Sequence, residues 1–196
     1  MLDTAEQGGS QIVLEDFSKI KVVKLSEIFD LRKFDCGDKD INDFLWNDAL
    51  RYQKANIATT LLFIYENSIL GFCSLAADSV KLEKGKEDAK IRGGLGGHVH
   101  DEYPALKLAR FGRDIKFRKM GIGDFVLNYV VGLAVKLNED AAIRFITLDS
   151  YLKKVEYYIE RGFVRNLHPD YKQADGRPVS MRLDLKFVYD ASSEKK

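Results

Sequence analysis

The chain has 196 residues, of which 45% are hydrophobic and 31% are charged, and its formal net charge is +1. This composition is typical of one soluble globular domain, and the balanced charge gives no general attraction to nucleic acid or membranes. The two cysteines are too few and too far apart for a disulfide framework, which favours the reducing cytoplasm. The N-terminus lacks a signal-peptide pattern, and no apolar run reaches the roughly 20 residues of a membrane span.

The chain divides into one expected domain with polar ends. Residues 1–17 are polar and contain glycine, so we expect a flexible leader. Residues 18–189 carry the apolar patterns of a single domain. Within it, residues 81–102 are dense in charge and then rich in glycine, which predicts a flexible insertion; the functional alternative is a flap over bound substrate. Residues 190–196 form a polar tail.

The first half of the domain predicts a strand, a helix and a hairpin. Residues 19–25 alternate as a strand does. Asp38 or Asp40 is placed to cap a helix. The apolar residues of this helix share one face: Ile41, Phe44, Leu45, Ala49 and Tyr52. Two β-rich runs, 59–65 and 69–75, are separated by Glu-Asn-Ser, which is the pattern of a β-hairpin.

The second half alternates between strands and helices. Strands are predicted at residues 105–111, 143–149 and 179–187. A long helix begins near Asp124 and is apolar nearly all round, so we expect it to pack against a sheet. Its main apolar face is Val126, Tyr129, Val130, Leu133 and Leu137. A short helix with an apolar face of Leu152, Val155 and Ile159 ends at Gly162. This order of elements predicts an α/β or α+β fold, a mixed sheet flanked by helices.

The turn Arg118-Lys119-Met120-Gly121-Ile122-Gly123 lies between a predicted strand and the long helix. At a helix start several backbone N–H groups have no partner, and the helix dipole adds positive potential. Glycine also lets the backbone approach a ligand closely. The turn therefore predicts a phosphate cradle at the carboxyl end of a strand. It lacks the signatures of dinucleotide folds and nucleotide P-loops, which count against a nucleotide-binding protein.

The pattern R-x-x-G-x-G between a strand and an apolar helix resembles motif A of the GNAT superfamily of N-acetyltransferases. Tyr157-Tyr158-Ile-Glu-Arg-Gly162-Phe163 is similar to the [F/Y]-Y-x-x-x-G-F segment of that family. The run Phe34-Asp-Cys-Gly-Asp-Lys-Asp-Ile-Asn-Asp-Phe-Leu resembles an N-terminal segment of a bacterial branch that includes acetyltransferase toxins. The resemblance covers most of residues 19–188, and it implies a GNAT-like, mostly antiparallel central sheet.

The resemblance implies acetyl-CoA as co-substrate and assigns the residues that bind it. Backbone N–H groups of the turn would bind the pyrophosphate, and those of the preceding strand would hold the acetyl carbonyl. The implied cofactor-binding residues are Phe111, Gly112, Arg113, Arg118, Lys119, Met120, Gly121, Ile122 and Gly123. The family usually has Leu-Ala-Val on this strand, so Phe111-Gly112-Arg113 departs from its pattern.

Tyr158 is the implied catalytic residue. Its hydroxyl would lie near the CoA sulfur and act as general acid, because a phenol with a pKa of about 10 is protonated at neutral pH. The structural alternative is that Tyr158 is an aromatic packing residue. For a general base, Asp149, Glu102 and His100 are candidates, although many enzymes of the family use water chains instead.

The histidines do not predict a metal site. His98 and His100 share one face of an extended segment, but two imidazoles without a third ligand are insufficient. We expect them and His168 to be loop residues, and we expect no metal cofactor.

These patterns predict an acetyl-CoA-dependent N-acetyltransferase that modifies a primary amine of a small molecule or protein. The alternatives are a toxin-type enzyme acting on aminoacyl-tRNA and a non-catalytic acyl-CoA-binding module. A tRNA partner would need basic residues that are clustered in the sequence: Lys107, Arg110, Arg113, Lys116, Arg118 and Lys119, with 81–90 nearby. No membrane partner is expected, and the resemblance leaves a homodimer open.

Overall fold

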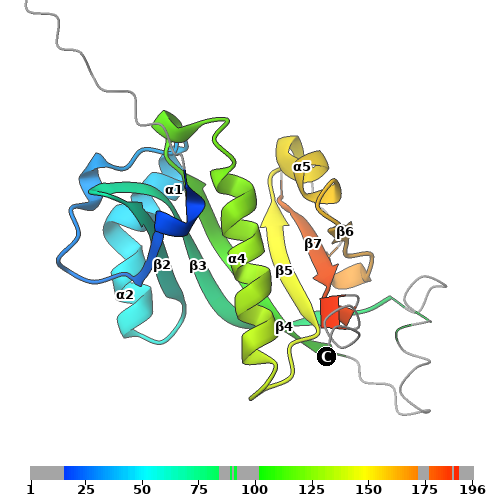
Figure 1. Cartoon of the computed structure of the whole chain (residues 1–196). Helices are drawn as coiled ribbons and strands as arrows, with labels where there is room; N and C mark the ends of the chain where they lie inside the picture. Colours follow the sequence, from blue (N-terminus) through cyan, green and yellow to red (C-terminus); the bar gives the residue numbers. More distant parts are fainter. Residues whose placement is uncertain are drawn as a thin grey trace, which may run out of the picture.

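Seven strands form one sheet in the order β1-β2-β3-β4-β5-β7-β6. The structure is a computed structural model that describes residues 16–83, 89, 91, 102–171, 177–186 and 188–189. Strands β4 and β5 are parallel, and all other neighbours in the sheet are antiparallel. The predicted fold, a mixed and mostly antiparallel sheet flanked by helices, is confirmed (Figure 1).

The elements follow the predicted order, with one two-residue strand in addition. The strands are β1 Lys21–Lys24, β2 Thr59–Tyr65, β3 Ser68–Lys81, β4 Glu102–Arg113, β5 Phe145–Ser150, β6 Val164–Arg165 and β7 Val179–Asp184. The helices are α1 Lys39–Asp43, α2 Ala49–Lys54, α4 Ile122–Leu137 and α5 Val155–Ile159, with a π-helical turn, Phe44–Asp48, joining α1 to α2. Short 3-10 turns occur at Phe17–Lys19, Leu31–Lys33, Ile115–Phe117, Leu152–Lys154 and Pro169–Tyr171. Among the described residues, none of these helices is long and apolar enough to cross a membrane.

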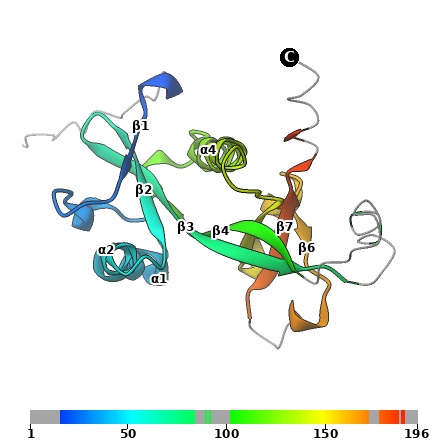
Figure 2. The same cartoon turned by 90° about the horizontal axis from the view of Figure 1, so that it is seen from below.

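The sheet is covered on both faces. Figure 2 shows α4 on one face and the pair α1–α2 on the other, and we call these the α4 face and the α1 face. The core of the α4 face joins side chains of the sheet to α4 and α5, including Phe63, Leu108, Val126, Ile146 and Val155. The core of the α1 face consists of Leu25, Phe34, Phe44, Leu45, Ala49, Leu62 and Phe72. Because β2 and residues 70–75 of β3 are covered on both sides, their sequences are mostly apolar runs, whereas the second half of β3 alternates in burial.

Two predicted helix faces need correction. In α4 the fully buried residues are Ile122, Val126, Leu127, Val130 and Ala134. Leu137 is 39% exposed, because α4 crosses one face of the sheet and its last turn extends past the core. In the short helical segment only Val155 is buried, whereas Leu152 is 68% and Ile159 42% exposed. The segment begins as a 3-10 turn, so the α-helical spacing assumed for Leu152 does not apply.

The predicted leader, insertion and tail lie mostly outside the described residues. Of the leader only Asp16 and Phe17 are described. Of residues 81–102, the structure places the end of β3 and, at Glu102, the beginning of β4. Both strands are longer than predicted and pair from Gly71 with Arg113 to Lys81 with Glu102.

The parallel strands β4 and β5 separate near their carboxyl ends. They pair only from Ala105 with Phe145 to Leu108 with Leu148, although β4 continues to Arg113. The separation begins at a β-bulge, because the register between β3 and β4 shifts beside Ala109. A bulge bends its strand and increases the local twist, so the last five residues of β4 turn away from β5. This separation opens the sheet itself.

Candidate functional site

A cleft of about 690 Å³ lies where β4 and β5 separate. Its walls come from β4, β5, the start of α4, α5, α1 and the segment before α1. Elements on both faces of the sheet therefore line the cleft. The lining includes most of the predicted site: Phe111, Gly112, Arg113, Lys119, Gly121, Ile122, Gly123 and Tyr158. Arg118 and Met120 belong to the same turn but do not line the cleft. Arg118 extends toward Gly37, and Met120 packs against the core of the α4 face.

The predicted cradle has the backbone geometry of an anion site. Gly121 is the N-cap of α4 in the left-handed conformation, with φ +72°, and no side chain caps the helix. Lys119 also has a positive φ of 65°. Left-handed residues in a turn direct neighbouring N–H groups into a concave anion site. The first intrahelical bond is donated by Phe125 to Gly121, so the N–H groups before Phe125 have no partner within the helix.

A network of hydrogen bonds holds the start of this turn. The buried carboxylate of Asp114 accepts hydrogen bonds from the N–H groups of Lys116 at 2.8 Å and Asp35 at 3.3 Å. Asp35 in turn accepts from Gly37 and from the amide of Asn42, both at 2.7 Å. These bonds and the charges of nearby basic residues lower the pKa of Asp35. The run beginning at Phe34 therefore ties α1 to the cradle.

The strand wall departs from the family pattern for a packing reason and offers an unpaired cation. A Cβ on Gly112 would lie 2.7 Å from the ring of Phe72 and 3.0 Å from Ile41, so the core of the α1 face excludes larger side chains.

At Arg113 the Nη1 atom is buried and has no hydrogen-bond partner among the described residues. A buried guanidinium nitrogen without an acceptor is unfavourable, and a bound anion would relieve it. Together with the uncapped helix, this fits a phosphate-bearing ligand.

Tyr158 lies on the cleft wall, as predicted. Its ring packs edge-on against Phe163 and Tyr157. Burial raises the pKa of Tyr158 to about 12, which the charge of Arg161 only partly offsets. The hydroxyl is therefore protonated at neutral pH, and it makes no hydrogen bond to a described residue. It is available as a proton donor, and the general-acid role that the resemblance implies stays a prediction.

A second group at the start of α4 was not predicted. The hydroxyl of Tyr157 donates to Asp124 at 3.2 Å, and Arg161 Nε donates to the same carboxylate at 2.5 Å. A Cβ on Gly123 would lie 2.5 Å from that hydroxyl, so only glycine fits there without displacing Tyr157. In the sequence Asp124 resembles an ordinary first-turn acid, and nothing links it to Arg161, 37 residues away.

Charged side chains line the part of the cleft that comes from α1 and the residues before it, from β4, β5 and the turn before α5; we call this part the mouth. Asp38, Asp40 and Asp149 supply carboxylates, and Arg110 and Lys154 supply cations. Asp38 also caps α1 through the N–H of Ile41, so its position is fixed by the helix. The predicted capping role of Asp38 is thus correct, and its place at the mouth was not foreseen.

The base candidates lie in different surroundings. Asp149 lines the cleft and forms an ion pair with Lys107 at 2.8 Å. Glu102 is remote from the cleft, at the other end of β4, where it accepts a hydrogen bond from Ser79. His100 and His98 lie outside the described residues, and His168 accepts a hydrogen bond from the N–H of Asp170. In the part of the chain that the structure describes, no three His, Cys, Asp or Glu side chains are placed to hold a metal ion.

The predicted basic cluster does not form one surface. Lys107 pairs with Asp149, and Lys81 with Asp170. Arg110, Arg113 and Lys119 line the cleft, whereas Arg118 does not. The cations that reach the cleft are thus fewer than the sequence suggested.

The sheet order, the separated parallel strands and the glycine turn are together those of a GNAT-like fold. No protein-family model matches the sequence, and no curated protein matches it. Among solved structures, a tyrosine-to-phenylalanine variant of KacT superposes with a TM-score of 0.72 at 15% identity, covering 88% of this chain and 99% of that one. AtaT complexed with acetyl-methionyl-tRNAfMet gives 0.72 at 16% identity over 88% and 99%. AtaTR bound with AcCoA gives 0.70 at 15% identity over 89% and 99%. At such identities the likeness establishes the fold.

Proposed function

We propose that the protein is an acetyl-CoA-dependent N-acetyltransferase that modifies a primary amine. One observation carries the proposal: a single cleft through the opened sheet joins an uncapped helix start and a protonated tyrosine to an open, charged mouth. The first part suits a phosphate-bearing donor, and the second gives a separate route for an acceptor. The fold shared with AtaTR bound with AcCoA supports this choice of donor.

Acetyl-CoA would supply the activated acetyl group, and the protein would orient it. The N–H groups at the start of α4 would bind the pyrophosphate together with Arg113. Residues 110–113 of β4 pair with β3 on one side only, so backbone groups facing the cleft are free to hold the acetyl carbonyl. Holding both ends of the donor would fix the thioester in the gap between the strands.

Two side chains would handle the protons. As the amine nitrogen bonds to the acetyl carbon and the carbon–sulfur bond breaks, Tyr158 would donate its proton to the leaving thiolate. The proton lost by the amine would pass to water or to Asp149, which stands at the mouth on the acceptor side. The tyrosine is reprotonated from solvent, so the enzyme returns to its initial state.

An aminoacyl-tRNA acceptor is the second candidate. Support comes from the shared fold with AtaT, solved in complex with acetyl-methionyl-tRNAfMet. Four cations line the cleft; Arg113 is assigned to the donor, and the other three, Arg110, Lys119 and Lys154, would contact phosphates of a tRNA acceptor end. Binding that depends on such contacts falls steeply with salt.

The test is a thioester-cleavage assay with acetyl-CoA and three acceptor classes: small amines, peptides and charged tRNA. Thiol release with one class, and the acetylated product identified by mass spectrometry, would establish both activity and acceptor. Binding of acetyl-CoA without thiol release across the panel would instead indicate a non-catalytic acyl-CoA-binding module. No binding of acetyl-CoA at all would refute the proposed function.

A further inference from the structure

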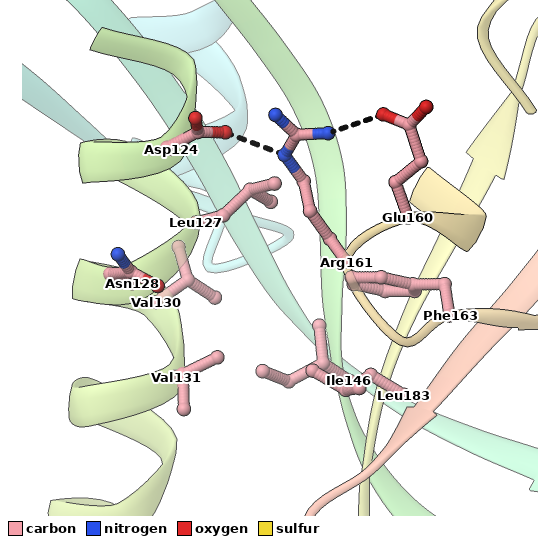
Figure 3. Close-up of a pocket in the computed structure, with 10 residues that line it drawn as sticks. All are labelled: Asp124, Leu127, Asn128, Val130, Val131, Ile146, Glu160, Arg161, Phe163 and Leu183. Atoms are coloured by element: carbon pink, nitrogen blue, oxygen red, sulfur yellow. Dashed lines mark hydrogen bonds and ion pairs between the residues drawn. The ribbon is translucent and has the colours of Figure 1, made fainter. Parts of the chain in front are cut away.

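Arg161 crosses from the end of α5 to the first turn of α4. Figure 3 shows it reaching Asp124 above a hollow of about 380 Å³, whose apolar wall includes Leu127, Val130 and Ile146. Its Nε lies 2.5 Å from the Asp124 carboxylate, and its Nη1 donates to the carbonyl of Tyr157 at 2.7 Å. The guanidinium carbon lies 3.6 Å from the centre of the Tyr157 ring. Nη1 also forms an ion pair with Glu160 at 3.5 Å, so the guanidinium is held by two ion pairs, a backbone bond and an aromatic stack.

Asp124, the partner of Arg161, lies next to the cradle. Asp124 lies in the first turn of α4, directly after the cradle, and lines the cleft as well as the hollow. A carboxylate at a helix N-terminus interacts favourably with the dipole, so it competes with a bound anion for the same positive potential. Its side chain is 52% exposed, whereas that of Arg161 is only 27% exposed. The cation is therefore the better fixed member of the pair.

Both donors to Asp124 approach from the α5 side. Arg161 and the Tyr157 hydroxyl bind the same oxygen, Oδ1. The hydrogen bond from Arg161 is the main reason that the pKa of Asp124 is lowered, so the carboxylate is ionised at neutral pH. Without Arg161, a full negative charge would stand beside the cradle.

We propose that Arg161 is a positioning residue for the donor: by pairing with Asp124 it neutralises the one carboxylate in the first turn of α4, so that the cradle accepts the pyrophosphate of CoA. This inference rests on the proposed function, since it concerns the same cradle. If Arg161 is replaced, the affinity for CoA should fall because Asp124 keeps its charge, and not because Arg161 contacts the ligand.

The test is the affinity for CoA, measured by calorimetry, in four proteins: wild type, Arg161→Met, Asp124→Asn and the double variant. We expect about tenfold weaker binding for Arg161→Met, in the usual range for coupling between neighbouring charges. The double variant should bind within about twofold of wild type, because the unpaired carboxylate is gone. Its recovery would also show that Arg161→Met folds well enough to bind. A double variant as weak as Arg161→Met would overturn the proposal.

Pantetheine, which lacks the phosphates, is the matched probe. Arg161→Met should bind pantetheine as wild type does, and its loss for CoA should shrink at high ionic strength. An equal loss for both probes would contradict the charge argument. The two proposals fail differently: wild type that does not bind CoA refutes the proposed function. CoA binding that is unchanged by Arg161→Met refutes only the inference about Arg161.

Discussion

The two sides of the cleft are built in different ways. On the donor side one continuous stretch, the end of β4, a turn and the start of α4, supplies backbone N–H groups and the Arg113 guanidinium, and α5 adds Tyr158. The acceptor side brings together side chains from before α1, from β5 and from the segment before β7. Its carboxylates, Asp38, Asp40 and Asp149, come from segments more than 100 residues apart.

The two sides of the cleft therefore differ in how specifically they recognise a ligand. Backbone groups bind any ligand with the same phosphate, so residue identity in the turn of the donor side matters mainly at the glycines. Side chains determine charge and shape, so the acceptor side is free to change without disturbing the cradle. We therefore expect substitutions on the donor side to affect the use of acetyl-CoA, and those on the acceptor side to affect the amine.

The largest expected effect comes from the proton donor. Tyr158→Phe removes the hydroxyl but keeps the ring that packs on Phe163. Loss of a general acid slows the step that it assists, and general acid catalysis typically contributes roughly 10²–10⁴-fold. We therefore expect kcat to fall at least tenfold. The affinity for acetyl-CoA should stay within about twofold, measured by calorimetry. An unchanged kcat would remove the catalytic role and leave Tyr158 as a packing residue.

The same contrast explains how much the sequence could predict. The cradle and Tyr158 follow from short-range patterns, because a helix start and a tyrosine segment are local features. The order of elements also followed from local apolar periodicity. The bridge between Asp124 and Arg161 has no local signal, since it depends on how α5 packs beside α4. The wrong face for Leu152 has a related cause: the periodicity was taken as α-helical where the segment starts with a 3-10 turn.

The acceptor side was the least predictable. Asp38 was recognised as a helix cap and not as part of the mouth, because the sequence does not show that α1 lies beside the ends of β4 and β5. The opening between β4 and β5 arises from the bulge beside Ala109, which has no glycine or other local marker. Basic residues that cluster in the sequence are distributed over different surroundings in the sheet, so their number overstated the charge at the cleft.

Gly121→Ala tests whether the donor side depends on backbone conformation. An alanine at φ +72° costs about 1–2 kcal/mol, so the turn should shift and direct its N–H groups away from the phosphate. We expect KM for acetyl-CoA to rise about tenfold, the equivalent of about 1.4 kcal/mol, with KM for the amine little changed. Gly132→Ala, in the same helix with open space around its Cβ, is the control. It should leave KM unchanged and stabilise the fold by about 0.5–1 kcal/mol.

Asp149→Asn tests the acceptor side. The carboxylate is 43% exposed and paired with Lys107, so its attraction for an ammonium group is partly screened. We expect kcat/KM for the amine to fall about three- to fivefold, corresponding to under about 1 kcal/mol, while KM for acetyl-CoA stays constant. Steady-state kinetics with each substrate varied in turn separates the two. A change confined to acetyl-CoA would contradict the division of the cleft.

The pH dependence of stability gives a further test of the donor side. Burial raises the pKa of Tyr158 and of Tyr157 to about 12 in the folded protein, whereas an unfolded tyrosine titrates near about 10. A folded pKa above the unfolded value means that the stabilisation is complete below pH 10 and is lost as pH rises toward 12. Between pH 9 and 11, the free energy of unfolding should therefore fall less in Tyr158→Phe than in wild type, by about 1 kcal/mol.

Tyr151 provides the matched comparison on the acceptor side. Burial, followed by the charges of Asp38 and Asp40, raises its pKa as well, but 42% of the residue is exposed. Solvent therefore stabilises its phenolate in the folded protein more than that of Tyr158. Urea unfolding of Tyr151→Phe at pH 9 and 11 should consequently resemble wild type more closely than Tyr158→Phe does. If the free energy of unfolding fell equally between pH 9 and 11 in both variants, the two sides of the cleft would not differ in how they exclude water around a tyrosine.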